Sequence, residues 1–311
     1  AIRCNVVTLS EGDVPFGERV ILDHSAGEIS TEEADELVRA LNEALPMEGR
    51  HLYTGVSYRH CMLWKGADPT YNFARPHDHL GEKIGAYLPK DEDGGREFRE
   101  FMEKGFAVLD HHPVNERRRA EGKNPANAPW LWSPGRKPAL PSFREKWNLD
   151  ASIVCAVDLI KGIGICAGCE VVSVPGATGN YYTNYLGKGE AAIDAFQRGS
   201  DLVYVHVEAP DECGHQGNPV EKTSAIEKID AEILAPVYQY LVDSDEDFKI
   251  LCLPDHPTPC EKRTHTSDPV PYFLYDSRVD LAGCAFTEKT CAAMNDYNPT
   301  GHTLLSEVIE K

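Results

Sequence analysis

The sequence has no run of apolar residues long enough to cross a membrane. Its 311 residues are 41% hydrophobic, an ordinary share for a globular protein, and no stretch approaches the roughly 18 apolar residues that a spanning helix needs. The basic start and apolar segment of a secretory signal peptide are also missing. We therefore expect no membrane partner, and the length is sufficient for two domains.

Positive charge is scarce. The chain has 31 Lys and Arg against 50 Asp and Glu, for a formal net charge of −19. A surface of this sign repels the phosphate backbone of nucleic acids, so we expect no nucleic-acid partner. A small anionic substrate would need a local basic pocket that opposes the overall field.

Ten cysteines are spread along the chain without the spacing of a disulfide framework. We expect free thiols and a cytoplasmic location, because the cytoplasm keeps thiols reduced. Cys166 and Cys169 have the CxxC spacing of redox and zinc sites. No second pair follows, so buried small side chains are the favoured interpretation.

The first 125 residues have the pattern of a mixed α+β domain. Strands are predicted at 1–9 and 19–23, with one or two more in 51–64. Between them a helix should begin after Ser30, with Glu33 completing a capping box. The basic stretch Arg117–Arg119 ends a later helix, and both a solvated helix end and a phosphate-binding role remain open for it.

From about residue 126 apolar strands alternate with helices. The predicted strands are Trp130–Trp132, Ser152–Val157, Glu170–Val174, Asp201–Val207 and Lys249–Leu253. A long helix is expected over 220–242, with Pro236 as a kink. Because the strands are continuously apolar rather than alternating, we predict a parallel sheet covered by helices on both faces. The expected domains are 1–125 and 126–311.

Carboxylates and imidazoles gather just after two of these strands. Asp211 and His215 follow one strand, Asp255 and His256 follow another, and His265 lies nine residues further on. In open α/β sheets this edge is where ligands and metals bind. The five oxygen and nitrogen donors therefore favour a site for a divalent ion such as zinc, manganese or iron.

The spacing of these residues allows them to share ions. Asp211 and His215 point to one side if the segment between them is helical. Pro254 and Pro257 favour a sharp turn, at which the adjacent pair between them can embrace one ion. Two ions would clamp phosphoryl oxygens, which predicts phosphoryl transfer or phosphoester hydrolysis with a Ser or Thr hydroxyl as the nucleophile.

Five motifs go beyond these candidate ligands: Asp23–Gly27, Gly55–His60, Asp158–Gly164, Glu208–Gly217 and Leu253–Pro259. Together they resemble a known family, the archaeal-type cofactor-independent phosphoglycerate mutases of the alkaline-phosphatase superfamily. The resemblance covers nearly the whole chain. It implies an α/β fold: an alkaline-phosphatase-like core with a mostly parallel sheet, preceded by an inserted α+β domain.

The resemblance also implies roles for single residues. Asp211, His215 and His265 would hold one divalent ion, and Asp255 and His256 would hold a second. Manganese is the first choice, with magnesium, zinc and cobalt as alternatives. Lys161 matches a family lysine near the phosphoryl group, and Arg59 lies in a motif that faces the substrate from the inserted domain.

The implied activity is the interconversion of 3-phosphoglycerate and 2-phosphoglycerate in glycolysis and gluconeogenesis. In the family a serine takes the phosphoryl group and returns it to the other hydroxyl of the substrate. A second hypothesis within the family is a homoserine kinase-like phosphotransferase, although no Walker loop or kinase glycine-rich loop is present. The oligomeric state is left open.

The sequence departs from the family pattern at its start. The family begins with a strand that ends in a metal-binding Asp-Gly pair, followed by the nucleophilic serine, and neither precedes Arg3. We therefore expect these residues to be part of a longer chain. On their own they should bind metal at Asp211, His215 and His265 without turnover, and the site at Asp255 and His256 should be weak.

Overall fold

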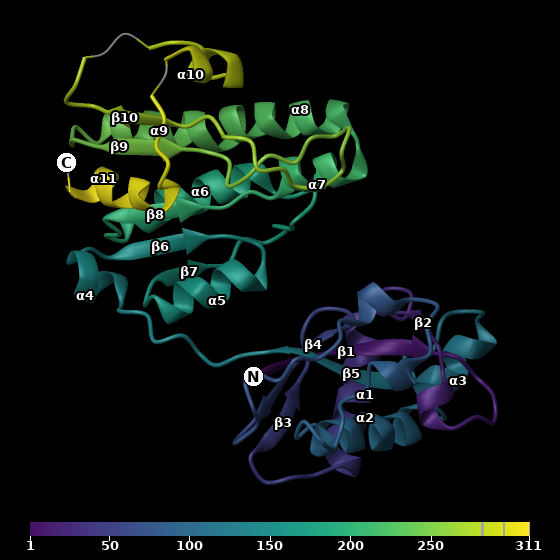
Figure 1. Ribbon diagram of the computed structural model, residues 1–311. Helices are drawn as coiled ribbons and strands as arrows, with labels where there is room; N and C mark the ends of the chain where they lie inside the picture. Colours follow the sequence, from purple (N-terminus) through teal and green to yellow (C-terminus); the bar gives the residue numbers. More distant parts are fainter. Residues whose placement is uncertain (281–282, 295, 311) are drawn as a thin grey trace. The chain divides into compact units, whose positions relative to one another are not determined.

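A computed structural model describes residues 1–280, 283–294 and 296–310 (Figure 1). The chain divides into two units, Ala1–Lys137 and Pro138–Lys311. In the described part of the chain, no helix is both long and apolar enough to span a membrane.

The first unit is built on a five-stranded antiparallel sheet. Its strands are β1 (Ile2–Leu9), β2 (Ile21–Asp23), β3 (Arg50–Tyr53), β4 (Arg59–Trp64) and β5 (Ala128–Pro134). β1 pairs with β2, β4 and β5, and β3 pairs with the far edge of β4. The strands predicted at 1–9, 19–23 and 51–64 are confirmed, the last as a pair of strands.

Helices lie along one side of this sheet (Figure 1), and β4 has exposed side chains on its other face. The helices are α1 (Thr31–Ala44), α2 (Arg96–Leu109) and α3 (Pro113–Ala120), with short 3-10 turns at Phe16–Glu18, Pro76–His79 and Ile84–Ala86. Side chains of β4 alternate between buried and exposed, as expected for a half-buried strand. Trp64 packs against the rings of Phe98 and Phe101 on α2, whereas Arg59 is on the exposed face.

The start of α1 differs from the predicted capping box in one respect. Ser30 is the N-cap, and its hydroxyl accepts a hydrogen bond from the backbone N–H of Glu33 at 3.2 Å. The Glu33 carboxylate does not return to the Ser30 backbone, because it accepts a hydrogen bond from Arg118 of α3 at 2.5 Å. The first turn of α1 is therefore tied to α3 instead of closing on itself.

Two arginines of the basic stretch form hydrogen bonds and ion pairs within the first unit. Arg118 has only 4% of its side chain exposed, and it also donates to the carbonyl oxygens of Asn124 and Ala26. Arg119 pairs with Glu11 and Asp110 at 2.6 Å each. These pairings give both guanidinium groups a structural role, in place of a solvated helix end or a phosphate site.

The division between the units falls later than the boundary at residue 125 that the sequence predicts. β5 carries the strand Trp130–Trp132, which was expected in the second domain, and it pairs with β1 through Asn5↔Trp130 and Arg3↔Trp132. This pairing buries Trp130 in the core of the first unit. The break therefore comes after Lys137.

The second unit has a three-stranded parallel sheet. Its strands are β6 (Ala151–Val154), β7 (Glu170–Val172) and β8 (Leu202–Val205), and its first helices are α4 (Phe143–Trp147), α5 (Asp158–Cys166) and α6 (Tyr185–Gln197). β6 lies between β7 and β8, and both pairings are parallel, which confirms the predicted sheet type. The chain steps to β7 and then crosses back over β6 to β8, so right-handed crossovers place α5 and α6 on opposite faces (Figure 1).

The remaining elements include a long helix and a second, antiparallel pair of strands. They are α7 (Ala209–Gln216), α8 (Pro219–Lys228), α9 (Ala235–Asp243), β9 (Lys249–Cys252), β10 (Phe273–Asp276), α10 (Glu288–Met294), a 3-10 turn at Gly301–Thr303 and α11 (Leu304–Glu310). The strand predicted at Lys249–Leu253 does not join the parallel sheet in the described part of the chain. It pairs with β10 instead, in antiparallel register.

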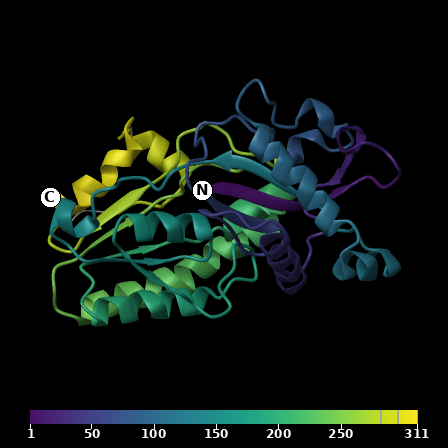
Figure 2. The same ribbon diagram turned by 90° about the horizontal axis from the view of Figure 1, so that it is seen from below.

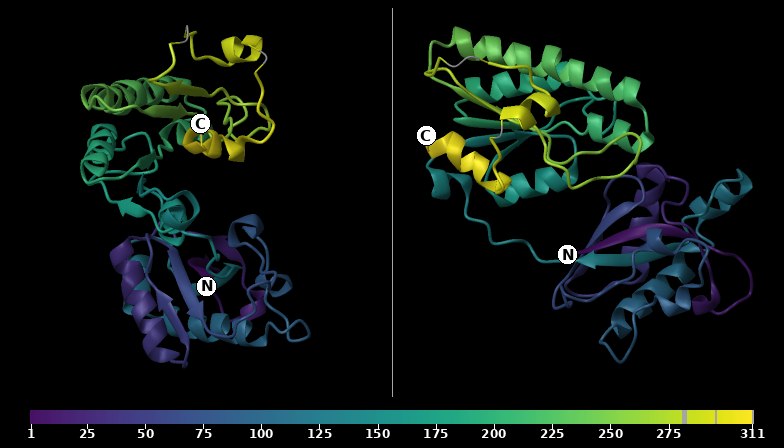
Figure 3. Two further views of the ribbon diagram at one scale, coloured as in Figure 1. Left: turned by 90° about the vertical axis from the view of Figure 1, so that its left-hand side faces the viewer. Right: turned by 45° about the horizontal axis from the view of Figure 1, so that its top comes forward.

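α8 and α9 form one long helix that packs beside α6 (Figures 2 and 3). The two are joined by a π-helical turn at Ile229–Leu234, just before Pro236. Proline has no N–H to donate to the preceding turn and its ring crowds the carbonyl there. The wider π-helical turn accommodates the missing N–H and the proline ring. It lies where the sequence predicts a kink.

Replacing Arg118 by alanine should destabilise the first unit by about 3 kcal/mol, because it leaves Glu33 and two carbonyl groups without their buried partner. Lysine should not restore the loss, since it lacks the forked guanidinium. Urea unfolding followed by tryptophan fluorescence measures this. Trp64, Trp130 and Trp132 all belong to the first unit, so the signal reports mainly on that unit.

Arg117→Ala is the matched control. The Arg117 side chain is 49% exposed and lies 3.7 Å from Glu33, so its loss should cost less than about 1 kcal/mol. Equal effects of the two alanine variants would contradict a structural role specific to Arg118.

Candidate functional site

α7 places two of the predicted ligands on one side of the second unit. It follows directly from β8, begins with Pro210 in its first turn and ends at Gly217, whose φ of 70° suits a residue without a side chain. Asp211 and His215 are therefore one helical turn apart. His215 Nε2 lies 3.3 Å from Asp211 Oδ2, as the four-residue spacing predicts.

His265 reaches the same point from the connection between β9 and β10, which runs beside α7 (Figure 1). Its Nε2 lies 3.3 Å from Asp211 Oδ1 and 3.1 Å from His215 Nε2. One donor atom from each of these three residues lies within 4.8 Å of the others. Donors bound to one ion at about 2.1 Å are separated by roughly 3–3.5 Å, so the three residues fit a single divalent cation.

The orientation of His215 also fits a metal ligand. Its Nδ1 lies 3.1 Å from the carbonyl oxygen of Arg263. A carbonyl can only accept, so this hydrogen bond places a proton on Nδ1, and in the neutral ring Nε2 presents its lone pair toward Asp211 and His265. Metal-binding histidines are commonly held in this way.

Asp255 and His256 form a second pair beside the first set. They occupy a turn just after β9, where the His256 backbone N–H donates to Asp255 Oδ1 at 3.0 Å. His256 Nε2 is 3.3 Å from Asp255 Oδ2, and its ring lies 3.8 Å from that of His265, centroid to centroid. Within the described residues this pair is not part of a set of three donors, in contrast to the set around Asp211.

Thr258 is a site residue that the sequence patterns do not single out. It is 3% exposed, and its hydroxyl donates a 2.5 Å hydrogen bond to Asp211 Oδ1. The same hydroxyl lies 3.3 Å from His256 Nδ1. One side chain therefore contacts a member of each predicted ligand group.

Two lysines lie near the carboxyl end of β6. Lys161 is on α5, with its side chain 32% exposed and its Nζ 3.4 Å from Asp158. Lys188 of α6 was not predicted from the sequence. It is 1% exposed and donates to the carbonyl of His206 at 2.9 Å. Burial raises the pKa of Cys155, just past β6, and the positive charges of both lysines oppose that rise.

Burial and neighbouring charges also shift the pKa values of two groups near the end of β8. Burial raises the pKa of Glu208, an effect that Lys188 opposes and the nearby Asp211 and Asp255 carboxylates reinforce. Burial lowers the pKa of Lys188. The ends of β6, β8 and β9 thus bring carboxylates, imidazoles and cations within electrostatic reach of one another.

Arg59 belongs to the first unit, on the open face of its sheet. Its guanidinium lies 4.2 Å from the Tyr58 ring centroid, and Arg3 lies 4.1 Å from that of Trp132. Burial lowers the pKa of Arg3, and the positive charge of Arg59 lowers it further. His77 completes this arginine–aromatic face, with its ring centroid 5.3 Å from that of Trp132. Two cations so close together are a suitable surface for an anion.

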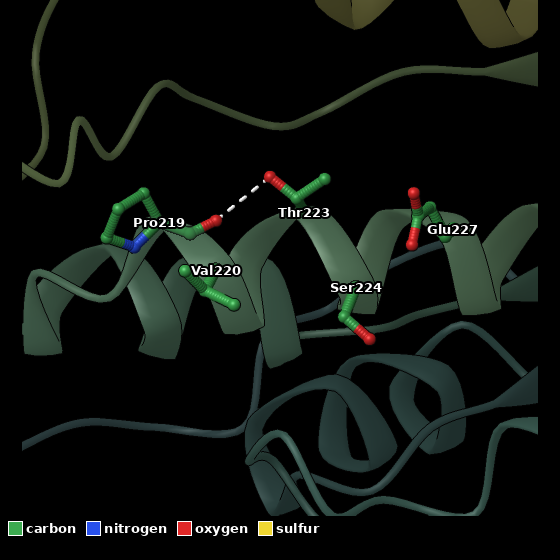
Figure 4. Close-up of a pocket in the computed structure, with 5 residues that line it drawn as sticks. All are labelled: Pro219, Val220, Thr223, Ser224 and Glu227. Carbon is green, nitrogen blue, oxygen red and sulfur yellow. Dashed lines mark hydrogen bonds between the residues drawn. The ribbon is translucent and has the colours of Figure 1, made fainter.

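A separate hollow runs along α8, lined by Pro219, Val220, Thr223, Ser224 and Glu227 (Figure 4). Its Thr223 hydroxyl is already bonded to the Pro219 carbonyl at 2.9 Å. The polar groups do not converge on one point, so this hollow has less of the character of a binding site than the cluster around Asp211.

Known proteins resemble this chain over most of its length. The family model of the metalloenzyme superfamily matches residues 21–304. A 2,3-bisphosphoglycerate-independent phosphoglycerate mutase of Methanosarcina mazei is 46% identical over 88% of this chain and 67% of its own length. A probable enzyme of the same name from Geobacter sulfurreducens is 41% identical over 100% of this chain and 77% of its own.

Solved structures show the same fold. The cofactor-independent phosphoglycerate mutase of Thermoplasma acidophilum has a TM-score of 0.64 at 24% identity, over 99% of this chain and 75% of its own. A Pyrococcus horikoshii protein also has a TM-score of 0.64, at 27% identity, over 88% of this chain and 63% of its own. The α/β, alkaline-phosphatase-like fold predicted from the sequence is confirmed.

The chain thus spans about two thirds to three quarters of the length of these relatives. Its matches are nevertheless continuous over most of its own residues. It belongs to the metalloenzyme superfamily and, within that superfamily, to the 2,3-bisphosphoglycerate-independent phosphoglycerate mutases.

Proposed function

We propose that this chain provides the metal centre of an enzyme that interconverts 3-phosphoglycerate and 2-phosphoglycerate. The observation that carries the proposal is the convergence of Asp211, His215 and His265 within 4.8 Å, in a chain whose relatives bear the name phosphoglycerate mutase. Membership of the metalloenzyme superfamily implies the use of divalent metal. The particular ions and their number are part of the proposal.

We assign one ion to Asp211, His215 and His265, and a second to Asp255 and His256. Mixed carboxylate and imidazole donors suit manganese, with magnesium, zinc and cobalt as alternatives. When bound, such ions supply positive charge that stabilises a phosphoryl group in transfer. The second pair brings only two donors, so its ion should bind more weakly than the first.

The chain's own cations then have distinct tasks. Lys161 has an ammonium group near the end of β6, where it can hold a phosphoryl oxygen. Arg59 and its neighbour Arg3 offer two positive charges on the arginine–aromatic face, suited to the carboxylate or phosphate of phosphoglycerate. These local positive groups oppose a net charge of −19, as an anionic substrate requires.

We assign no nucleophile among the described residues. Thr258 has a hydroxyl beside the proposed ligands, but this side chain is 3% exposed and bonded to Asp211. A hydroxyl so placed is not accessible to a substrate. The relatives are longer than this chain, so activity is to be tested on a parent protein of their length and metal binding on these 311 residues.

The 311-residue chain should bind one equivalent of Mn²⁺ tightly, and His265→Ala should weaken this binding strongly. The loss should exceed the roughly 10–100-fold that removal of a supporting hydrogen bond costs, because a direct donor is removed. Titration calorimetry and metal analysis measure both the affinity and the stoichiometry. His111→Ala is the control, since its side chain is 85% exposed in the first unit. Unchanged affinity in His265→Ala would exclude the assigned ligand set.

The parent protein loaded with Mn²⁺ should interconvert the two phosphoglycerates, and Lys161→Met should reduce kcat about 100-fold, the usual cost of removing a group that stabilises developing charge. Coupling the product to enolase gives the rate. Lys146→Met is matched to it, because Lys146 lies over the Trp147 ring on α4. A metal-loaded parent that turns over homoserine and ATP but not phosphoglycerate would refute the assignment.

In the same assay Arg59→Ala should raise KM by about tenfold with a smaller change in kcat. Loss of a charge-assisted hydrogen bond to a bound anion is worth roughly 1.5–3 kcal/mol. Arg39→Ala provides the comparison, since that side chain is 64% exposed in an ion pair on α1. If both variants keep the parental KM, the arginine–aromatic face does not bind the substrate.

A further inference from the structure

Thr258 lies where the two predicted ligand groups meet. It follows the Asp255–His256 turn by two residues and is buried, with 3% of its surface exposed. Its hydroxyl is 2.5 Å from Asp211 Oδ1 and 3.3 Å from His256 Nδ1. The direct contact from His256 Nδ1 to Asp211 Oδ1 is longer, at 4.0 Å. The hydroxyl is therefore the shortest link between these two residues.

The protons on this link can be counted. A hydroxyl has one proton to donate, and an ionised carboxylate can only accept. Thr258 thus donates to Asp211, and its oxygen lone pairs are left to accept from His256. His256 can donate to them from Nδ1, which in the neutral ring leaves the lone pair of Nε2 free; the other tautomer would instead donate from Nε2 to Asp255 Oδ2. That Nε2 is the atom 3.3 Å from Asp255 Oδ2.

The position of Thr258 is fixed from its backbone as well. Its carbonyl accepts a hydrogen bond from Lys222 Nζ of α8 at 2.7 Å. The same carbonyl lies against Gly214 of α7, where a Cβ atom would come within 2.3 Å of it. The N–H of Thr266 closes the loop on the Pro257 carbonyl at 3.1 Å. The side chain and the carbonyl of Thr258 are therefore both engaged by the helices that carry the site.

We propose that Thr258 is a positioning residue for the metal centre: its hydroxyl orients the Asp211 carboxylate and selects the His256 ring nitrogen that faces a metal. The proposal rests on the metal centre proposed above. His215 is oriented by the Arg263 carbonyl in a comparable way. Thr258 differs in serving one residue of each ligand group, so it couples the geometry of the two.

Two substitutions separate the hydroxyl from the packing. Thr258→Val keeps the branched shape and removes the hydroxyl, whereas Thr258→Ser keeps the hydroxyl and removes a methyl group. Mn²⁺ affinity of the 311-residue chain should fall about 10–100-fold in the valine variant, the usual effect of losing a hydrogen bond that supports a ligand. The serine variant should bind nearly as tightly as the unsubstituted chain.

Thermal melting of the metal-free variants distinguishes a positioning role of Thr258 from a packing role. A packing role would lower the melting temperature and leave the metal affinity of the folded protein unchanged. The proposal is overturned if the valine variant binds Mn²⁺ as tightly as the unsubstituted chain, or if serine and valine weaken binding equally.

A measurement on the unsubstituted chain covers the case in which the valine variant does not fold. Long-range ¹H–¹⁵N correlation spectra of ¹⁵N-histidine-labelled, metal-free protein at about pH 8.5, where free imidazole is neutral, identify the protonated ring nitrogen. His256, assigned through a His256→Gln variant, should carry its proton on Nδ1. A proton on Nε2 would overturn the proposal.

The two proposals fail separately. If the unsubstituted chain does not bind Mn²⁺, the proposed metal centre fails, and the histidine spectrum still decides whether Thr258 sets the ring nitrogen. If the unsubstituted chain binds and Thr258→Val binds equally well, the metal centre stands and the role of Thr258 is refuted.

Discussion

Carboxylates lie within electrostatic reach of one another at the ends of β8 and β9, together with the buried ammonium group of Lys188. Burial raises the pKa of Glu208, and the nearby charges of Asp211 and Asp255 raise it further. Lys188 opposes that shift from α6, at the cost of burying an ammonium group that reaches a single carbonyl at 2.9 Å. A divalent cation would be the largest positive charge in such a place. The charges at this sheet edge therefore favour a cation, in agreement with the proposed ligand set.

Much of this arrangement follows from local sequence patterns. Apolar runs predict the strands of the parallel sheet, and Ser30 predicts the start of α1. Both signals are local, because they depend on neighbours within a few residues. Asp211 and His215 were predictable as a pair, since an i, i+4 spacing on a helix fixes their direction. Pro254 and Pro257 indicated the turn that carries Asp255 and His256. These features need no knowledge of distant contacts.

The features that were missed depend on long-range pairing. Local patterns assign β5 to the second domain, whereas its register with β1, more than 120 residues earlier in the sequence, places it in the first unit. The Glu33 side chain leaves its capping box for Arg118, 85 residues away. Thr258 contacts Asp211 across 47 residues, and a threonine between prolines has no local signature. A single sequence does not reveal which distant partner an unremarkable polar residue will meet.

The long connection from β9 to β10, residues 253–272, has a consequence for order in the second unit. Without internal helix or strand, a free segment of this length would gain considerable conformational entropy, about 1–2 kcal/mol per residue released. Its contacts with α7 and α8 divide it into shorter closed loops, and the cost of closing a loop rises only slowly with length. A cation held between His265 and α7 would act as one more cross-link in the middle of this segment. Binding of a cation at the proposed metal centre and ordering of the connection would then be linked, and each would favour the other by the same free energy.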